Sequence, residues 1–205
     1  MFTKIIDFIL HIDSYLSLII DSYGNLIYGI LFTTIFLETG LVVTPFLPGD
    51  SLIFVAGTFA SSGLLNVYLL FALIAIAAIL GDTINYTIGK KFGEKVFAKF
   101  IKKEHMQKTK DFYKKYGKKT IVLARFVPIV RTLAPFIAGV GEMEYKTFIS
   151  YNIIGGISWV AIFLFTGYFF GNFTFVKENL TAITLLVIFV SILPAIIEVI
   201  RSKRQ

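Results

Sequence analysis

The chain has 205 residues, of which 56% are hydrophobic and 22 are phenylalanine, and its net charge at neutral pH is +7. Its mean hydropathy of +0.78 exceeds that of ordinary soluble domains, so the composition predicts an integral membrane protein. The sequence contains no cysteine, which excludes disulfides and thiolate metal sites.

The first predicted element, residues 1–22, is apolar but contains Asp7, His11 and Asp13. These polar residues favour an amphipathic helix at the membrane surface over a transmembrane helix. Only Lys4 precedes the apolar stretch, and no small-residue cleavage site follows it. We therefore expect the segment to be retained, unlike a signal peptide.

The next apolar stretch, residues 26–62, is interrupted by Pro45, Pro48 and Gly49. Proline removes a backbone donor and breaks helical continuity, and inside a membrane such a break needs protein or a water-filled cavity around it. We expect a re-entrant helical hairpin here, with these three residues at its tip.

A transmembrane helix is predicted at residues 64–88, because its apolar length suffices to cross about 30 Å of hydrocarbon. The following residues, 90–119, contain twelve lysines and three acidic residues, a local charge of +9. Such a concentration of basic residues predicts a cytoplasmic location. The segment is also a candidate surface for anionic membrane lipids, although its role in setting the topology already accounts for its charge.

A second broken apolar stretch, residues 120–140, contains Pro128 and Pro135, which we expect at the tip of a second re-entrant hairpin. It also contains Arg125 and Arg131, where a membrane segment ordinarily carries no charge. An arginine at the centre of such a segment costs about 2.5 to 3.5 kcal/mol on insertion. The two arginines are therefore the leading candidates for a functional site.

Two further transmembrane helices are predicted at 148–170 and 181–200, ahead of a basic cytoplasmic tail at 201–205. An even number of crossings must separate this tail from the lysine-rich segment. Since the two helices already supply two crossings, the arginine stretch should enter and leave on the same side. The predicted fold is one all-α polytopic membrane domain, 1–205, with two oppositely oriented re-entrant hairpins in an inverted-repeat arrangement. The alternative is a pair of ordinary proline-kinked helices.

Three acidic residues in apolar surroundings, Glu38, Asp50 and Asp82, are candidates for pairing with the arginines or for carrying a coupled proton. Because a guanidinium can bind phosphate oxygens through two parallel hydrogen bonds, Arg125 and Arg131 are candidates for binding a phosphate group. The structural alternative is that these charges only hold the hairpins together. For Asp82 a further alternative is solvation near the cytoplasmic end of its helix.

The other polar and aromatic residues in the apolar segments receive simpler interpretations. Asn152 is expected to form a hydrogen bond between helices, and Trp159 to be a packing residue. His11 and His105 stand alone, so we expect no metal site and no cofactor. No nucleic-acid partner is expected.

Five runs between residues 26 and 171 together resemble the DedA family, which is also called the SNARE-associated or VTT-domain family. One departure is Ala124, where the family commonly has glycine. The runs are Glu38-x6-Pro45-x2-Pro-Gly-Asp50, Gly81-Asp82-x3-Tyr86-x2-Gly89-x3-Gly93, Phe112-x3-Tyr116-Gly117, Ala-Arg125-Phe-Val-Pro-Ile-Val-Arg131-Thr-Leu-Ala-Pro135-x2-Ala-Gly139, and the stretch 152–171 with Trp159.

The resemblance implies a multi-pass protein of the bacterial or archaeal cytoplasmic membrane that moves lipid head groups across the bilayer. Bacterial members are associated with returning undecaprenyl phosphate, the lipid carrier of cell-wall synthesis, to the cytoplasmic leaflet, and with dependence on the proton motive force. We therefore expect a flippase for a phosphate-bearing lipid, whose phosphate is bound by Arg125 and Arg131. We expect no catalytic residue and a cytoplasmic C-terminus. The alternatives are a proton-coupled antiporter of small cations and, less favoured, a membrane enzyme acting on lipid phosphates. The sequence leaves a homo-oligomer open.

Overall fold

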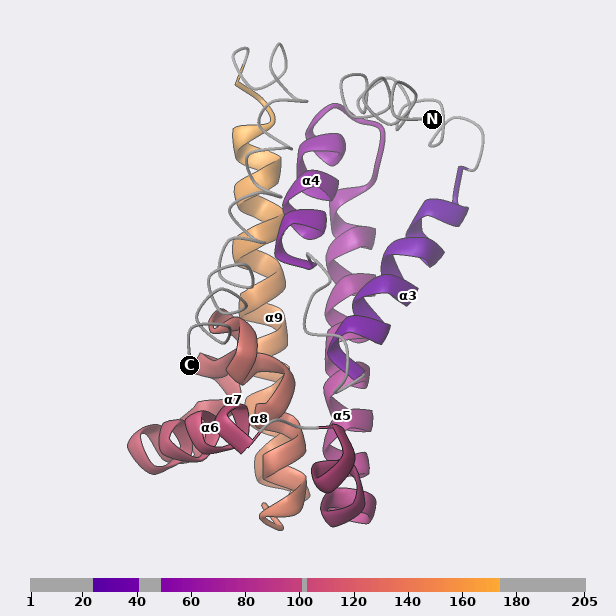
Figure 1. The fold of residues 1–205 in the computed structure, drawn as a ribbon. Coiled ribbons are helices and arrows are strands. Elements are labelled where there is room, and N and C mark those ends of the chain that lie inside the picture. The colour runs from indigo at the N-terminus through magenta and orange to yellow at the C-terminus, as the bar shows by residue number, and fades with distance from the viewer. Residues whose placement is uncertain (1–23, 41–48, 101–102, 174–205) are drawn as a thin grey trace, which may run out of the picture. The chain divides into compact units, whose positions relative to one another are not determined.

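A computed structural model describes residues 24–40, 49–100 and 103–173, and the secondary structure within them is helical, with no strand (Figure 1). The expected all-α class is confirmed for this part of the chain. The predicted helices at 1–22 and 181–200, the tail at 201–205 and the tip prolines Pro45 and Pro48 lie outside it. The elements are α3 (Leu26–Gly40), α4 (Gly49–Ser61), α5 (Val67–Phe100), α6 (Lys103–Tyr116), η1 (Gly117–Lys119), α7 (Thr120–Leu123), η2 (Ala124–Phe126), α8 (Pro128–Val140) and α9 (Tyr145–Phe170).

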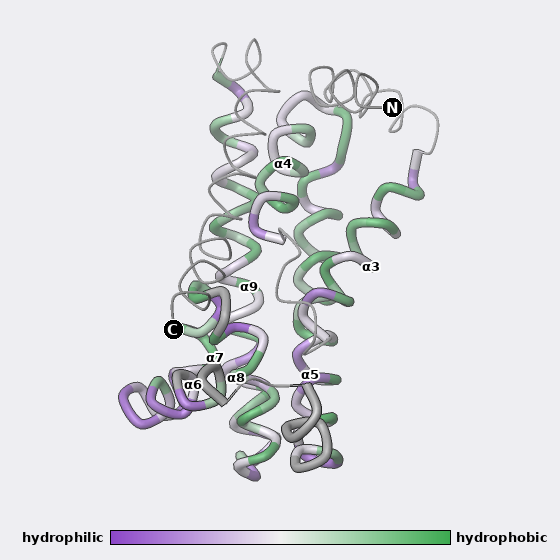
Figure 2. The backbone as a smooth tube through the Cα atoms, in the orientation of Figure 1, coloured by the Kyte–Doolittle hydropathy of each residue, from purple (hydrophilic) through white to green (hydrophobic). Residues whose placement is uncertain are grey.

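Two of these helices contain segments long and apolar enough to cross a membrane, Val67–Gly93 of α5 and Tyr145–Phe170 of α9. They correspond to the transmembrane helices predicted at 64–88 and 148–170. Figure 2 shows the contrast in hydropathy, with hydrophobic residues prevailing along much of α5 and α9 and hydrophilic residues prevailing on α6.

The boundaries of α5 have a local cause. Asn66 caps its first turn, because the side-chain oxygen accepts hydrogen bonds from the backbone N–H groups of Tyr68 and Leu69, both at 3.0 Å. The helix then continues to Phe100, twelve residues past the predicted end at 88. Lysine, glutamate and alanine favour helix and no proline follows, so the charged residues extend the helix in place of ending it.

The arginine stretch breaks at Val127, whose extended backbone (φ −123°, ψ 103°) separates η2 from α8. A residue before proline is driven towards this conformation, and Pro128 then stands at the first position of α8, where no N–H is needed. We expected Pro135 to interrupt the helix at the hairpin tip as well, and this was wrong: Pro135 lies inside α8. A re-entrant path for either broken stretch stays a prediction, as does the inverted repeat.

The chain divides into two compact units, and α3, α5 and α9 each contribute residues to both. One unit comprises Met1–Leu31, Pro48–Phe71 and Ala161–Gln205. Within it α4 lies so close to α9 that a Cβ on Gly57 would overlap with the carbonyl oxygen of Leu164. Glycine at this position therefore permits the close approach of the two helices.

The other unit comprises Phe32–Leu47 and Ala72–Val160. In it α8 lies against α5, because a Cβ on Gly139 would overlap with the carbonyl oxygen of Tyr86. Helix α6 packs on α8, and the partly buried phenol of Tyr113 donates a hydrogen bond to the carbonyl oxygen of Ala134 at 2.8 Å. Burial, and next the charge of Asp82, raises the pKa of Tyr113, so this donor stays protonated.

Candidate functional site

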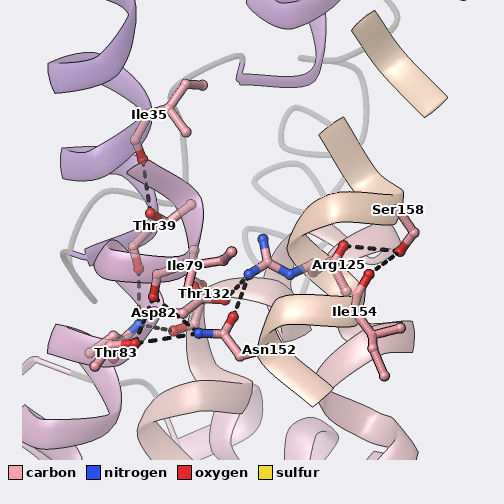
Figure 3. A network of polar contacts seen from close by, with 12 residues as sticks. Ile35, Thr39, Ile79, Asp82, Thr83, Arg125, Thr132, Asn152, Ile154 and Ser158 are labelled. Atoms are coloured by element: carbon pink, nitrogen blue, oxygen red, sulfur yellow. Dashed lines mark hydrogen bonds and ion pairs between the residues drawn. The ribbon is translucent and has the colours of Figure 1, made fainter. Parts of the chain in front are cut away.

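Arg125 and Asp82 form a buried ion pair within the second unit. The Nη2 atom of Arg125 lies 2.5 Å from Oδ2 of Asp82, and it also donates to Oδ1 of Asn152 at 2.6 Å (Figure 3). The side chains of the arginine and the aspartate are only 2% and 4% exposed. The guanidinium is thus held by a carboxylate from α5 and by an amide from α9.

The geometry of this pair restricts what else Arg125 can bind. A guanidinium offers two edges for bidentate binding of a phosphate, one formed by Nε and Nη2 and the other by Nη1 and Nη2. Nη2 has two hydrogens, and Asp82 and Asn152 accept from it. Nε and Nη1 have no hydrogen-bond partner among the described residues. Both edges are therefore half occupied, and a bidentate ligand must displace Asp82 or Asn152.

Arg131 forms a second buried ion pair, with Glu38. Nη2 of Arg131 donates to Oε1 of Glu38, which is fully buried, while the arginine side chain is 7% exposed. The two residues are 93 positions apart in the sequence and lie on α8 and α3. Since removal of one partner leaves the other charge buried and uncompensated, each pair depends on both of its members.

Asn85 forms hydrogen bonds to both helices that carry the second ion pair, α3 and α8. Its Nδ2 donates to the carbonyl oxygens of Thr132 at 2.8 Å and of Thr39 at 3.3 Å. These two threonines directly follow Arg131 and Glu38 in the chain. Asn85 is fully buried, and its Oδ1 has no hydrogen-bond partner within the described part of the structure. The amide therefore fixes the backbone on both sides of the ion pair.

One face of α9 receives the side chain of Arg125. Asn152, Gly155, Gly156 and Trp159 share this face, because they are three or four residues apart around the helix. A Cβ on Gly155 would lie 3.1 Å from Nε of Arg125, a tight approach that the glycine avoids. Asn152 also donates to the carbonyl oxygen of Ile79 at 3.0 Å, which confirms its predicted role between helices.

The structure contradicts one sequence-based expectation at this site and leaves another untested. The alternative that Asp82 is solvated was wrong, since the residue is 3% exposed and paired with Arg125. Asp50 stands in the first turn of α4, which belongs to the other unit, and its role stays a prediction. Gly49 begins α4. Within the described ranges no group of three or more His, Asp or Glu side chains could hold a metal ion.

Sequence reasoning missed Asn85 and the pair Gly155 and Gly156. A polar side chain inside the apolar helix α5, three residues after Asp82, was the available indication for Asn85. For the glycines, the indication was their place on the same helical face as Asn152.

Comparison with known proteins identifies the family. A family model described as the VTT domain matches residues 45–169. The chain is 55% identical to Protein DedA of Escherichia coli K12, covering 98% of this chain and 94% of that protein. It is also 30% identical to the inner membrane protein YghB of the same organism, over 76% of this chain and 73% of YghB, and 31% identical to the inner membrane protein YqjA, over 72% and 69%. No solved structure matches the chain. The chain therefore belongs to the DedA family of VTT-domain proteins.

Proposed function

We propose that this protein moves a phosphate-bearing lipid, such as undecaprenyl phosphate, across the bacterial inner membrane, and that the movement is coupled to the proton motive force. The observation that carries the proposal is the pair of buried arginine–carboxylate contacts in a chain whose long helices are apolar. Two relatives are named as inner membrane proteins, which supports the location.

The chemistry of the two pairs matches that of an anionic head group. A carboxylate and a phosphate offer similar oxygens to a guanidinium, so each can replace the other while the charge of the arginine stays compensated. Arg125 and Arg131 are both largely buried in this structure. We therefore interpret it as the occluded state, in which Asp82 and Glu38 occupy the arginines until a lipid phosphate displaces them.

Exchange of carboxylate for phosphate on an arginine also explains how transport would be coupled to protons. When phosphate takes over a guanidinium, the displaced carboxylate is left in apolar surroundings, where its neutral form is favoured. Uptake of a proton by Asp82 or Glu38 would accompany phosphate binding, and its release would accompany return to the ion pair. Asp50 remains a third candidate for this role.

The test uses purified protein in liposomes that contain a fluorescent polyprenyl phosphate and, in parallel, a fluorescent neutral lipid. Arg125→Lys and Arg131→Lys keep the positive charge but lose the planar fork. Each should slow the flipping of the phosphate lipid about tenfold or more, because one charge-assisted hydrogen bond to phosphate is lost. Ser150→Ala, which changes an exposed hydroxyl on α9, is the matched control and should retain the normal rate.

Wild-type rates for both lysine variants would refute the assignment of the arginines. Equal flipping of the neutral lipid would refute selection by phosphate. A flux of small cations across liposomes that contain no polyprenyl phosphate would favour the antiporter, and accumulation of dephosphorylated lipid would favour the enzyme.

A further inference from the structure

Trp159 lies against both arginines of the site. Its ring centroid is 5.8 Å from Cζ of Arg125 and 5.3 Å from Cζ of Arg131, and the side chain is fully buried. The two guanidiniums come from opposite sides of the break at Val127, Arg125 from η2 and Arg131 from α8. One indole ring therefore contacts the positive member of each ion pair.

This arrangement has an electrostatic consequence. Two like charges in a buried region repel each other more strongly than they do in water. The negative face of an indole attracts a cation within about 6 Å of its centroid, and the attraction increases when water is excluded. The ring thus stabilises both guanidiniums, and a change in either one alters the surroundings of the other.

We infer that Trp159 is a positioning residue that couples the two ion pairs. Because both guanidiniums share this ring, loss of Asp82 or Glu38 from one pair weakens the other pair as well. The consequence for transport rests on the proposed function, since it would make the two arginines act together on one phosphate lipid. The coupling itself does not depend on the proposed function, and it can be measured without any lipid substrate.

The chain contains a single tryptophan, so fluorinated tryptophan supplied during expression replaces Trp159 alone. Added fluorine atoms withdraw electron density from the ring while changing its size little, which weakens the attraction for cations in steps. The melting temperature of the purified full-length protein should fall progressively from mono- to trifluorotryptophan, by about 4 to 8 °C in total. The fall should be smaller in Asp82→Asn/Arg125→Met protein, which lacks one of the two cations.

A double-variant cycle measures the coupling directly. Asp82→Asn and Glu38→Gln should shift the melting temperature non-additively when Trp159 is present, because both carboxylates hold guanidiniums that share one partner. The non-additivity should become clearly smaller in Trp159→Leu protein, where only the direct interaction between the charges of the two pairs is left, and Trp159→Phe should restore it. Phe148→Leu is the packing control: it removes another buried ring of α9, one that stacks on Tyr86 at 4.3 Å, and should leave the non-additivity unchanged.

A flat response to fluorination overturns the inference, as does a cycle whose non-additivity is as large in Trp159→Leu protein as in the wild type. If either result occurred while the lysine variants still slowed lipid flipping, the proposed function would stand without Trp159. If the coupling were found but no lipid moved, the role of Trp159 would stand and the transport proposal would fail.

Discussion

Removal of the negative charge of Asp82 should destabilise the protein strongly. Asp82→Asn keeps the shape of the side chain but leaves the guanidinium of Arg125 without a countercharge. Both side chains are almost fully buried, at 4% and 2% exposure, so water cannot replace the lost partner. Breaking a buried pair from one side costs about 3 to 5 kcal/mol, and we expect the lower end because the amide oxygen can still accept a hydrogen bond.

For a chain of this length, about 3 kcal/mol corresponds to a fall in melting temperature of about 6 to 12 °C. Thermal unfolding of purified protein in detergent measures this shift. Asp111→Asn is the matched control, since Asp111 is exposed on α6 and accepts a hydrogen bond only from the side chain of Gln107 in the described structure. Its melting temperature should stay within about 2 °C of the wild type.

A second variant separates loss of charge pairing from general damage at the site. Arg125→Met alone leaves Asp82 uncompensated, whereas Asp82→Asn/Arg125→Met removes both charges. The double variant should be less destabilised than the sum of the single variants, because replacement of a whole buried pair by neutral groups is often tolerated. An Asp82→Asn protein that melts within 2 °C of the wild type, or a double variant with an additive loss, would show that this reasoning is wrong.

Three further predictions concern the helices that carry the site, and all are measured by thermal unfolding. Gly139→Ala should lower the free energy of unfolding by about 1 to 3 kcal/mol, because the added Cβ overlaps with the backbone of α5. In the control Gly29→Ala the added Cβ meets no atom within 4 Å, so the change should be neutral or slightly stabilising. Asn85→Ala should lower the free energy of unfolding by about 1 to 3 kcal/mol, because two hydrogen bonds to carbonyls of α3 and α8 are lost. Its control is Thr87→Ala, at an exposed position of α5, which should change the stability little. Tyr113→Phe should cost about 1 kcal/mol at neutral pH through the lost hydrogen bond to α8. Burial raises the pKa of Tyr113 in the folded protein, so the stability that its hydrogen bond contributes is present below about pH 10 and is lost as the pH rises above that value. Above about pH 10 the phenylalanine variant should therefore lose less stability than the wild type, and identical pH profiles of the two proteins would contradict this.

The helical elements were largely predictable because each depends on a local pattern. The apolar lengths of α5 and α9 indicated both long helices, and Pro128 indicated the break in the arginine stretch. Pro135 misled the prediction, because a proline inside a helix is tolerated when neighbouring groups satisfy the backbone that it frees. Pro135 lacks the N–H that would bond the carbonyl of Arg131, and the amide of Asn85 donates to the neighbouring carbonyl of Thr132 on the same turn of α8.

The partners of the charges were less predictable. The sequence indicated that Arg125 and Arg131 needed acidic partners, and it supplied Glu38, Asp50 and Asp82 as candidates. It could not assign them, because Arg125 reaches Asp82 across 43 residues and Arg131 reaches Glu38 across 93. The rotation of each packed helix decides which side chains face each other, and close contacts such as that of Gly139 with α5 fix this rotation.

The sequence by itself determined the class of the protein, an apolar helical chain with charges at positions where a membrane makes them costly. It could do so because hydropathy and the free-energy cost of burying a charge depend only on residue type and on position within a segment. The tertiary structure alone decided that two ion pairs, Asn85 and the indole of Trp159 form one connected site. Hydrogen bonds and contacts between charges and rings act over a few ångströms, so they depend on how helices distant in sequence are packed.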